Sequence, residues 1–207
     1  MKNSNSAALG FRTHSGWAAA VALCGPSRSP EVPEVIDRRR ITLVEPGSPG
    51  GVQPYHVART MNLPKAEEFI QTVILAVERT ALLAVRDFVE AINGMGHQIP
   101  CCGIVLASGR PLPSLEATLR SHAMVHTAEG ELYRAAIAKA AKNLNWRCVR
   151  VPERDLYKLA AKHLGIPEPK LKTRITEMGR GLGSPWSADE KCATLIAWLA
   201  LAGFEQS

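Results

Sequence analysis

The stretch Leu9-Gly10-Phe11-Arg12-Thr13-His14-Ser15-Gly16-Trp17 runs directly into the apolar segment Ala18-Ala19-Ala20-Val21-Ala22-Leu23-Cys24. Small and apolar residues on both sides of a short polar segment indicate a strand, a tight turn and a second strand. We expect these strands at 8–12 and 17–24. The chain therefore opens with two consecutive strands, and this opening sets the fold class.

The rest of the chain alternates between strand and helix patterns. The clearest is a helix over 64–93, in which apolar residues from Ile70 to Ile92 recur at a spacing of 3.6 residues and Asn93-Gly94 closes the segment. Further strands are expected at 35–44, 100–107 and 146–151, and further helices at 114–122, 128–144, 152–163, 168–178 and 188–202. This order predicts an α/β fold with a mixed five-stranded sheet, three antiparallel strands followed by αβαβ, flanked by helices and extended by C-terminal helices.

The element order and the first turn resemble the ribonuclease H-like superfold, in particular its RuvC and YqgF resolvase branch. By element order the resemblance covers 8–203 as a single domain, with 1–7 as a disordered N-terminus. Members of this branch cleave nucleic acid with carboxylates on the first strand, the fourth strand and the last helix, which together hold two divalent metals.

Matched residue by residue, this chain departs from that pattern. Arg12 stands in the place of the first acid, and 106–108 (Leu-Ala-Ser) offers no acid for the second. In the last helix Asp189 matches one acid, but Cys192 stands where another is expected. Because a cation at Arg12 would repel Mg²⁺ or Mn²⁺, we expect no metal cofactor and no conventional two-metal nuclease.

Under the same resemblance, polar residues gather where loops and helix N-termini meet the strand ends. His14, Glu129 and Asp189 are the candidate catalytic residues, because histidine and carboxylates serve as general acids or bases. The candidate ligand-binding residues are Arg12, Thr13, Ser108, Arg110, His126 and Lys191. Such a set suits a phosphodiester or another anion better than a bare metal; the alternative is that these are ordinary polar residues of loops.

A second polar segment, 121–131, contains two histidines four residues apart, His122 and His126. On one helix face they could bind a metal together with Glu129 or Glu131. Thr127, however, is a suitable N-cap, which would place His126 before the helix and separate the pair. Capping explains the segment more simply, and no metal site is expected here.

Composition places few limits on function. The net charge of +6 permits, without requiring, a nucleic-acid partner. Three successive arginines, Arg38 to Arg40, would alternate across an edge strand more often than form a phosphate-binding strip. The five cysteines form no CxxC pair, and no apolar run is long enough to cross a bilayer, so a cytoplasmic protein without membrane contact is expected.

We therefore carry two hypotheses. The first is a ribonuclease H-like protein that binds nucleic acid or another phosphate-bearing ligand, either without metal-dependent cleavage or with altered cleavage through Arg12, His14 and Glu129. The second is a non-catalytic interaction or assembly module, possible as a homo-oligomer, in which helices 64–93 and 188–202 form the partner surface. The missing acids and the strongly apolar last helix motivate the second hypothesis.

Overall fold

A computed structural model describes residues 6–26, 31–107 and 111–205. Five strands and seven helices occupy these ranges. The strands are β1 (Ser6–His14), β2 (Trp17–Cys24), β3 (Glu34–Thr42), β4 (Gln98–Leu106) and β5 (Arg147–Pro152). The helices are α1 (Pro54–Ala58), α2 (Leu63–Gly94), α3 (Leu115–Arg120), α4 (His122–Asn143), α5 (Glu153–Leu164), α6 (Glu168–Met178) and α7 (Ala188–Leu201).

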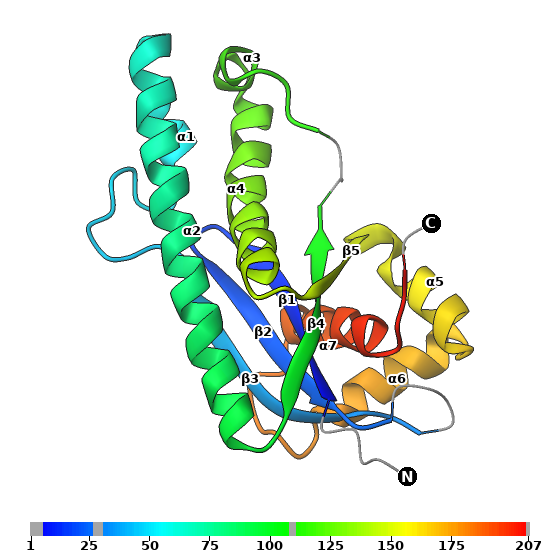
Figure 1. Cartoon of the computed structure of the whole chain (residues 1–207). Coiled ribbons are helices and arrows are strands. Elements are labelled where there is room, and N and C mark those ends of the chain that lie inside the picture. Colours follow the sequence, from blue (N-terminus) through cyan, green and yellow to red (C-terminus); the bar gives the residue numbers. More distant parts are fainter. Residues whose placement is uncertain (1–5, 27–30, 108–110, 206–207) are drawn as a thin grey trace.

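The strands form one mixed sheet in the order β3-β2-β1-β4-β5. β1, β2 and β3 pair in antiparallel fashion, whereas β4 pairs in parallel with β1 and β5 pairs in parallel with β4. This confirms the α/β class and the mixed five-stranded sheet expected from the sequence. The carboxyl ends of β1, β4 and β5 consequently lie at one end of the sheet, which Figure 1 shows beneath α4.

Helices cover both faces of this sheet. α2 and α4 pack on one face, and α7, itself covered by α5 and α6, packs on the other (Figure 1). The two adjacent cysteines of β4 lie in different cores. Cys102 belongs to the core under α2 and α4, and Cys101 belongs to the core under α7. Their side chains point to opposite faces, as expected for neighbours in a strand.

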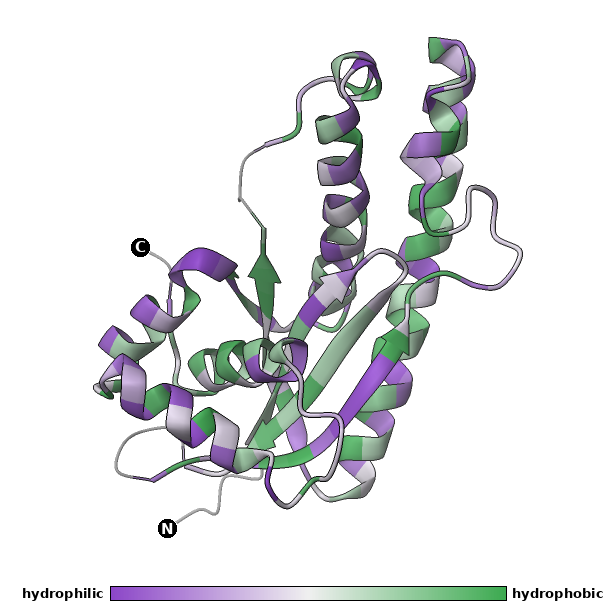
Figure 2. Ribbon diagram, turned by 180° about the vertical axis from the view of Figure 1, so that it is seen from behind, coloured by the Kyte–Doolittle hydropathy of each residue, from purple (hydrophilic) through white to green (hydrophobic). Residues whose placement is uncertain are grey.

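α7 lies directly against the middle of the sheet, at two glycines. A Cβ atom at Gly10 of β1 would overlap the backbone carbonyl oxygen of Ala193, and one at Gly103 of β4 would lie 2.6 Å from Ile196 Cγ1. Every residue of α7 from Cys192 to Ala200 is buried. Figure 2 shows this helix as a green, apolar element enclosed between the sheet and its neighbours. The expectation that 188–202 forms a partner surface is therefore wrong, because its apolar residues cover the sheet of the same chain.

The start of α4 also differs from the sequence prediction. The helix begins at His122, and the side chain of Ser121 caps it by accepting a hydrogen bond from the backbone N–H of Met124. Thr127 is not a cap; its hydroxyl donates to the carbonyl of Ala123 inside the helix. His122 and His126 therefore share a helix face, which the capping interpretation had ruled out.

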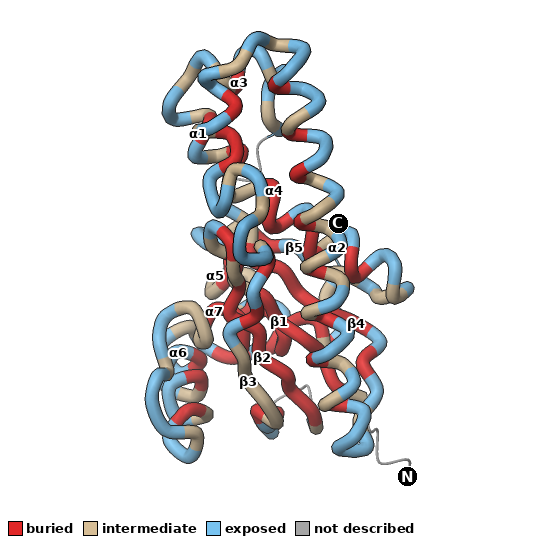
Figure 3. Tube along the Cα trace, turned by 90° about the vertical axis from the view of Figure 1, so that its left-hand side faces the viewer, coloured by how far each residue is buried: buried red, intermediate tan, exposed pale blue. Residues whose placement is uncertain are grey.

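A helical region extends beyond the end of the sheet, as Figure 3 shows. We call this region the apical lobe and define it as residues 54–70 and 115–129, which include α1, α3 and the first parts of α2 and α4. α1 was not expected from the sequence. None of the helices in the described ranges is long and apolar enough to cross a membrane.

The predicted domain began at residue 8, whereas β1 already includes Ser6 and Ala7. Residues 1–5 lie outside the described residues. All five cysteines are free thiols.

Candidate functional site at the carboxyl end of β1

The last residues of β1 place two polar side chains beside α7. Successive side chains of a strand alternate between its faces, and Ala8 and Gly10 face α7. Arg12 and His14 continue this row and reach the N-terminal end of α7. Thr13 lies between them on the opposite face, where it is buried and its hydroxyl has no hydrogen-bond partner within the described residues.

Arg12 forms an ion pair with a carboxylate from a neighbouring element. One of its terminal nitrogens lies 2.8 Å from Glu153 Oε2, and the other donates to the backbone carbonyl of Thr13 at 2.9 Å. Glu153 is the first residue of α5, immediately after β5. The side chains of Arg12 and Glu153 are 21% and 47% exposed, so the pair is open to solvent on one side.

The adjacent position on β4 is apolar. Phe11 pairs with Ile104 in the parallel register, so the next pair in that register sets Val105 beside Arg12. Val105 is buried in the core under α7 and thus shares the face of Arg12. The place beside Arg12 on β4 is thus occupied by a valine side chain, and Leu106 and Ala107, which follow it where the resemblance implies the second acid, carry no carboxylate.

His14 forms the second polar pair of the site. Its Nε2 lies 2.9 Å from Asp189 Oδ1, and its ring stacks on Trp17 with 4.4 Å between centroids and 12° between planes. The guanidinium of Arg40, from β3, lies over the ring of Trp17, 3.8 Å from the ring centroid. Arg40 is exposed, so its guanidinium stacks on Trp17 and still faces solvent.

Local sequence at the start of α7 fixes Asp189 in place. Ser187 caps the helix and Glu190 completes a capping box, in which the side chain of each residue accepts a backbone N–H at the start of the helix. These hydrogen bonds fix the first turn, which contains Asp189. Cys192 follows one turn later, and burial raises the pKa of its thiol to about 11, with Glu153 and Asp189 adding to the rise and Arg12 opposing it. Without a bound metal, the Cys192 thiol is therefore neutral at physiological pH.

Three of the predicted site residues lie together at the carboxyl end of β1, namely Arg12, His14 and Asp189. Lys191 is half-buried in the same turn of α7 as Asp189. Ser108 and Arg110 lie outside the described residues. His126 and Glu129 occupy the apical lobe, where Glu129 accepts a hydrogen bond from His56.

The donor set at the end of β1 does not fit two divalent metals. Two carboxylates are present, Glu153 and Asp189, but Glu153 is paired with a guanidinium and Asp189 with an imidazole. Hard divalent cations require several oxygen ligands, and Arg12 places a fixed positive charge among them. The arrangement suits an anion better, because Arg12 and Arg40 present two guanidinium groups near one strand end.

Glu153 was not proposed from the sequence, and Arg40 was weighed only as part of a phosphate-binding strip that was not favoured. Glu153 had a usable signal, because it directly follows a strand that is parallel to β4 and so emerges at the same end of the sheet. Arg38 donates to the backbone carbonyls of Leu182, Gly183 and Pro185 and so anchors the segment before α7.

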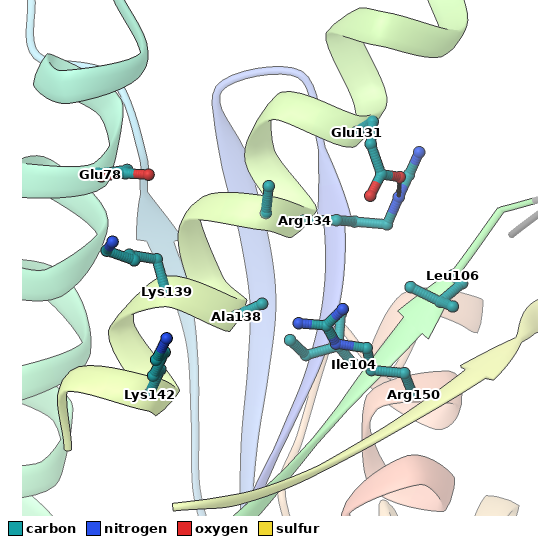
Figure 4. Close-up of a pocket in the computed structure, with 10 residues that line it drawn as sticks. Glu78, Ile104, Leu106, Glu131, Arg134, Ala138, Lys139, Lys142 and Arg150 are labelled. Atoms are coloured by element: carbon teal, nitrogen blue, oxygen red, sulfur yellow. Dashed lines mark hydrogen bonds and ion pairs between the residues drawn. The ribbon is translucent and has the colours of Figure 1, made fainter. Parts of the chain in front are cut away.

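A basic pocket of about 280 Å³ opens on the other face of the sheet, between α2, α4 and the ends of β4 and β5. Figure 4 shows four cationic side chains around it, Arg134, Lys139, Lys142 and Arg150, together with the carboxylates of Glu78 and Glu131. Glu131 is bound to Arg134 at 3.0 Å. The remaining cations give this pocket a net positive charge.

Arg150 also affects a neighbouring thiol. The thiol of Cys102 hydrogen-bonds to Cys148 and Arg150 adds a hydrogen bond and a positive charge, so the pKa of Cys148 falls to about 7 despite burial. Because the thiolate is the reactive form, we expect alkylation of Cys148 by iodoacetamide to rise through a midpoint near pH 7. Arg150→Gln should move this midpoint to higher pH. Site-resolved mass spectrometry measures both.

Cys192 serves as the internal reference for that measurement, because burial raises its pKa to about 11. It should react last and should be unaffected by Arg150→Gln. A midpoint for Cys148 as high as that of Cys192 would contradict the expected stabilisation of its thiolate.

Comparison with solved structures identifies the fold. The chain is similar to RuvC of Thermus thermophilus in complex with a Holliday junction substrate, with a TM-score of 0.50 and 9% identity over 93% of this chain and 90% of that chain. A second Thermus thermophilus RuvC structure gives a TM-score of 0.47 and 10% identity over the same shares. No protein-family model matches the chain, and no curated protein matches it by sequence. The protein has a RuvC-like, ribonuclease H-like fold, as the element order indicated.

Proposed function

We propose that this protein binds nucleic acid through the end of the sheet where Arg12 lies and does not cleave it by two-metal chemistry. The observation that carries the proposal is the ion pair of Arg12 with Glu153 at the position where the resemblance implies a metal-binding acid. A guanidinium at that position binds phosphate oxygens directly, as Arg does in many phosphate sites.

Three further features support binding. The chain carries a net charge of +6. Arg40 and Trp17 present a cation stacked on an aromatic ring next to His14, a combination suited to a phosphate with its neighbouring base. The RuvC structure to which the fold is similar is a complex with a Holliday junction, which makes branched DNA the first ligand to test.

Cleavage through Arg12, His14 and Glu129 acting together has no geometric support. His14 pairs with Asp189 at the end of β1, whereas Glu129 is buried beside His56 in the apical lobe. We propose a cytoplasmic location, in keeping with the five free thiols.

The test is a binding and cleavage assay on labelled four-way junction, duplex and single-stranded DNA, and on RNA, with and without Mn²⁺. We expect binding that weakens steeply with salt, because each neutralised phosphate releases a counterion. We expect no Mn²⁺-dependent products. Metal-dependent cleavage would overturn the assignment of Arg12, and no binding at low salt would overturn the nucleic-acid proposal.

One observation favours the assembly hypothesis as a second candidate. Leu75 and Leu83 of α2 are 58% and 54% exposed, so this helix leaves apolar side chains uncovered on its outer side. A second copy of the chain packing there would bury them. Sedimentation equilibrium should then show a dimer that Leu75→Lys dissociates; a monomer at all concentrations would exclude this candidate.

A further inference from the structure

Three histidines meet in the apical lobe, away from the end of β1. His56 comes from α1, and His122 and His126 lie one turn apart on α4. The Nε2 atoms of His122 and His126 are 3.1 Å apart, and one ring nitrogen from each of the three residues lies within 4.8 Å of the others. Two separate elements therefore direct imidazole nitrogens to one point.

A buried carboxylate lies behind one of these rings. Glu129, one turn after His126, is 2% exposed, and its Oε1 lies 3.1 Å from His56 Nδ1 and accepts the backbone N–H of His56 at 3.1 Å. With Nδ1 donating to Glu129, the Nε2 of His56 is left as an acceptor. A carboxylate that binds the far nitrogen of a histidine in this way is the usual support of a metal-ligating histidine. The second oxygen of Glu129 is buried and has no partner within the described residues.

We propose that His56, His122 and His126 form a binding site for a first-row transition metal ion of the zinc type, with Glu129 as the positioning residue of His56. Nitrogens bound to one tetrahedral zinc at 2.0–2.1 Å lie about 3.3 Å apart, close to the separation of the two α4 nitrogens. Three imidazoles with no carboxylate in the ligand set favour zinc, cobalt, nickel or copper over magnesium or calcium.

The site opens to solvent. His122 and His126 are exposed and His56 is half-buried. Three protein ligands leave a further coordination position for water or an external ligand, which is the arrangement of catalytic rather than closed structural zinc sites. A bound ion would also connect α1 to α4, because α1 supplies one ligand, His56, and α4 supplies the other two.

One neighbouring cation opposes metal binding. Arg59 Nη1 lies 3.4 Å from His122 Nδ1, and its Nε donates to the carbonyl of Leu119. When Nε2 of a neutral histidine binds a metal, Nδ1 carries the proton, so the Arg59 contact must open. Removal of the Arg59 charge should therefore strengthen binding.

The experiment uses the full chain without a histidine tag. Zn²⁺ affinity is measured by competition with a chromophoric chelator, and Co²⁺ is added as a spectroscopic probe. We expect one equivalent of metal, a visible Co²⁺ spectrum of nitrogen coordination without a thiolate charge-transfer band, and a rise in the melting temperature with Zn²⁺.

Variants assign the ligands. His122→Gln and His126→Gln should each weaken Zn²⁺ binding by about 100-fold or more, and Glu129→Gln by about 10- to 100-fold. Arg59→Gln should strengthen it several-fold. The matched control is His163→Gln, which removes a histidine of α5 that lies against Phe204 and outside the cluster; its affinity should equal that of the parent.

Each variant is first compared with the parent in melting temperature without metal, so that a folding defect is separated from a ligand defect. A loss of affinity in Glu129→Gln at an unchanged metal-free melting temperature assigns the positioning role. Absence of the Co²⁺ spectrum, a thiolate band, or full Zn²⁺ affinity in both His122→Gln and His126→Gln would each overturn the proposal. The result is independent of nucleic-acid binding at the end of β1.

Discussion

Gly10→Ala should destabilise the protein by about 3 kcal/mol, and lower its melting temperature by about 10 °C. The added methyl group would overlap the carbonyl oxygen of Ala193 and lie 2.8 Å from its carbonyl carbon and 2.9 Å from Ala197 Cβ. These are mostly backbone atoms of a buried helix, so α7 itself must move away from the sheet. Thermal and urea unfolding measure the change.

Gly94→Ala is the matched control. Gly94 is the last residue of α2, and a Cβ atom there would meet no atom within 4 Å. Its stability should stay within about 1 kcal/mol of the parent, because only the conformational freedom of the unfolded chain changes. If Gly10→Ala unfolds at the same temperature as Gly94→Ala, the close contact between α7 and β1 is not present in solution.

The second large effect concerns the Arg12–Glu153 pair, and here two substitutions should act in opposite directions. Arg12→Gln removes the cation and leaves Glu153 and Asp189 facing the ligand, so affinity for duplex or junction DNA should fall about 10-fold at 0.1 M salt. Glu153→Gln releases Arg12 from its partner, so affinity should rise several-fold. A plot of the logarithm of the binding constant against the logarithm of salt concentration has a negative slope. In Arg12→Gln this slope should become less steep by about one. Fluorescence anisotropy across a salt series measures all three quantities.

Lys162→Gln provides the charge control. It makes the same change in net charge as Arg12→Gln but lies in the last turn of α5, in an exposed position. The affinity of Lys162→Gln for DNA should change by less than about two-fold, because salt largely screens a charge at this distance from the ligand. If Arg12→Gln and Glu153→Gln shift affinity in the same direction, the pair acts through stability and not through ligand contact.

The element order was predictable because the strongest signals are periodic. The apolar spacing of α2 continues from Ile70 to Ile92, about six turns. The small residues of β1 and β2 flank a glycine turn. All three elements were therefore placed within about two residues. α1 has only five residues and no apolar period, and its helical state depends on packing against α2 and α4. Single-sequence patterns carry no such information.

The candidate site was only partly predictable, because it depends on the register between strands. The neighbour of Arg12 on β4 is Val105, a position that follows from the pairing of Phe11 with Ile104 and from no local pattern. The sequence offered Thr127 as the cap of α4, but Ser121 is a residue type that suits a cap equally well. The structure selects Ser121, and that shift of six residues brings His126 onto the same face as His122.

The Arg12–Glu153 contact also has a consequence for the conditions under which the fold persists. A guanidinium is attached to the chain and stays charged at every physiological pH. It therefore acts as an internal counterion for Glu153 that dilution, chelation or a change in the supply of magnesium does not remove. The charge of Glu153 is therefore neutralised by a residue of the same chain. We expect this end of the sheet to be equally stable in EDTA and in a solution that contains divalent metal ions.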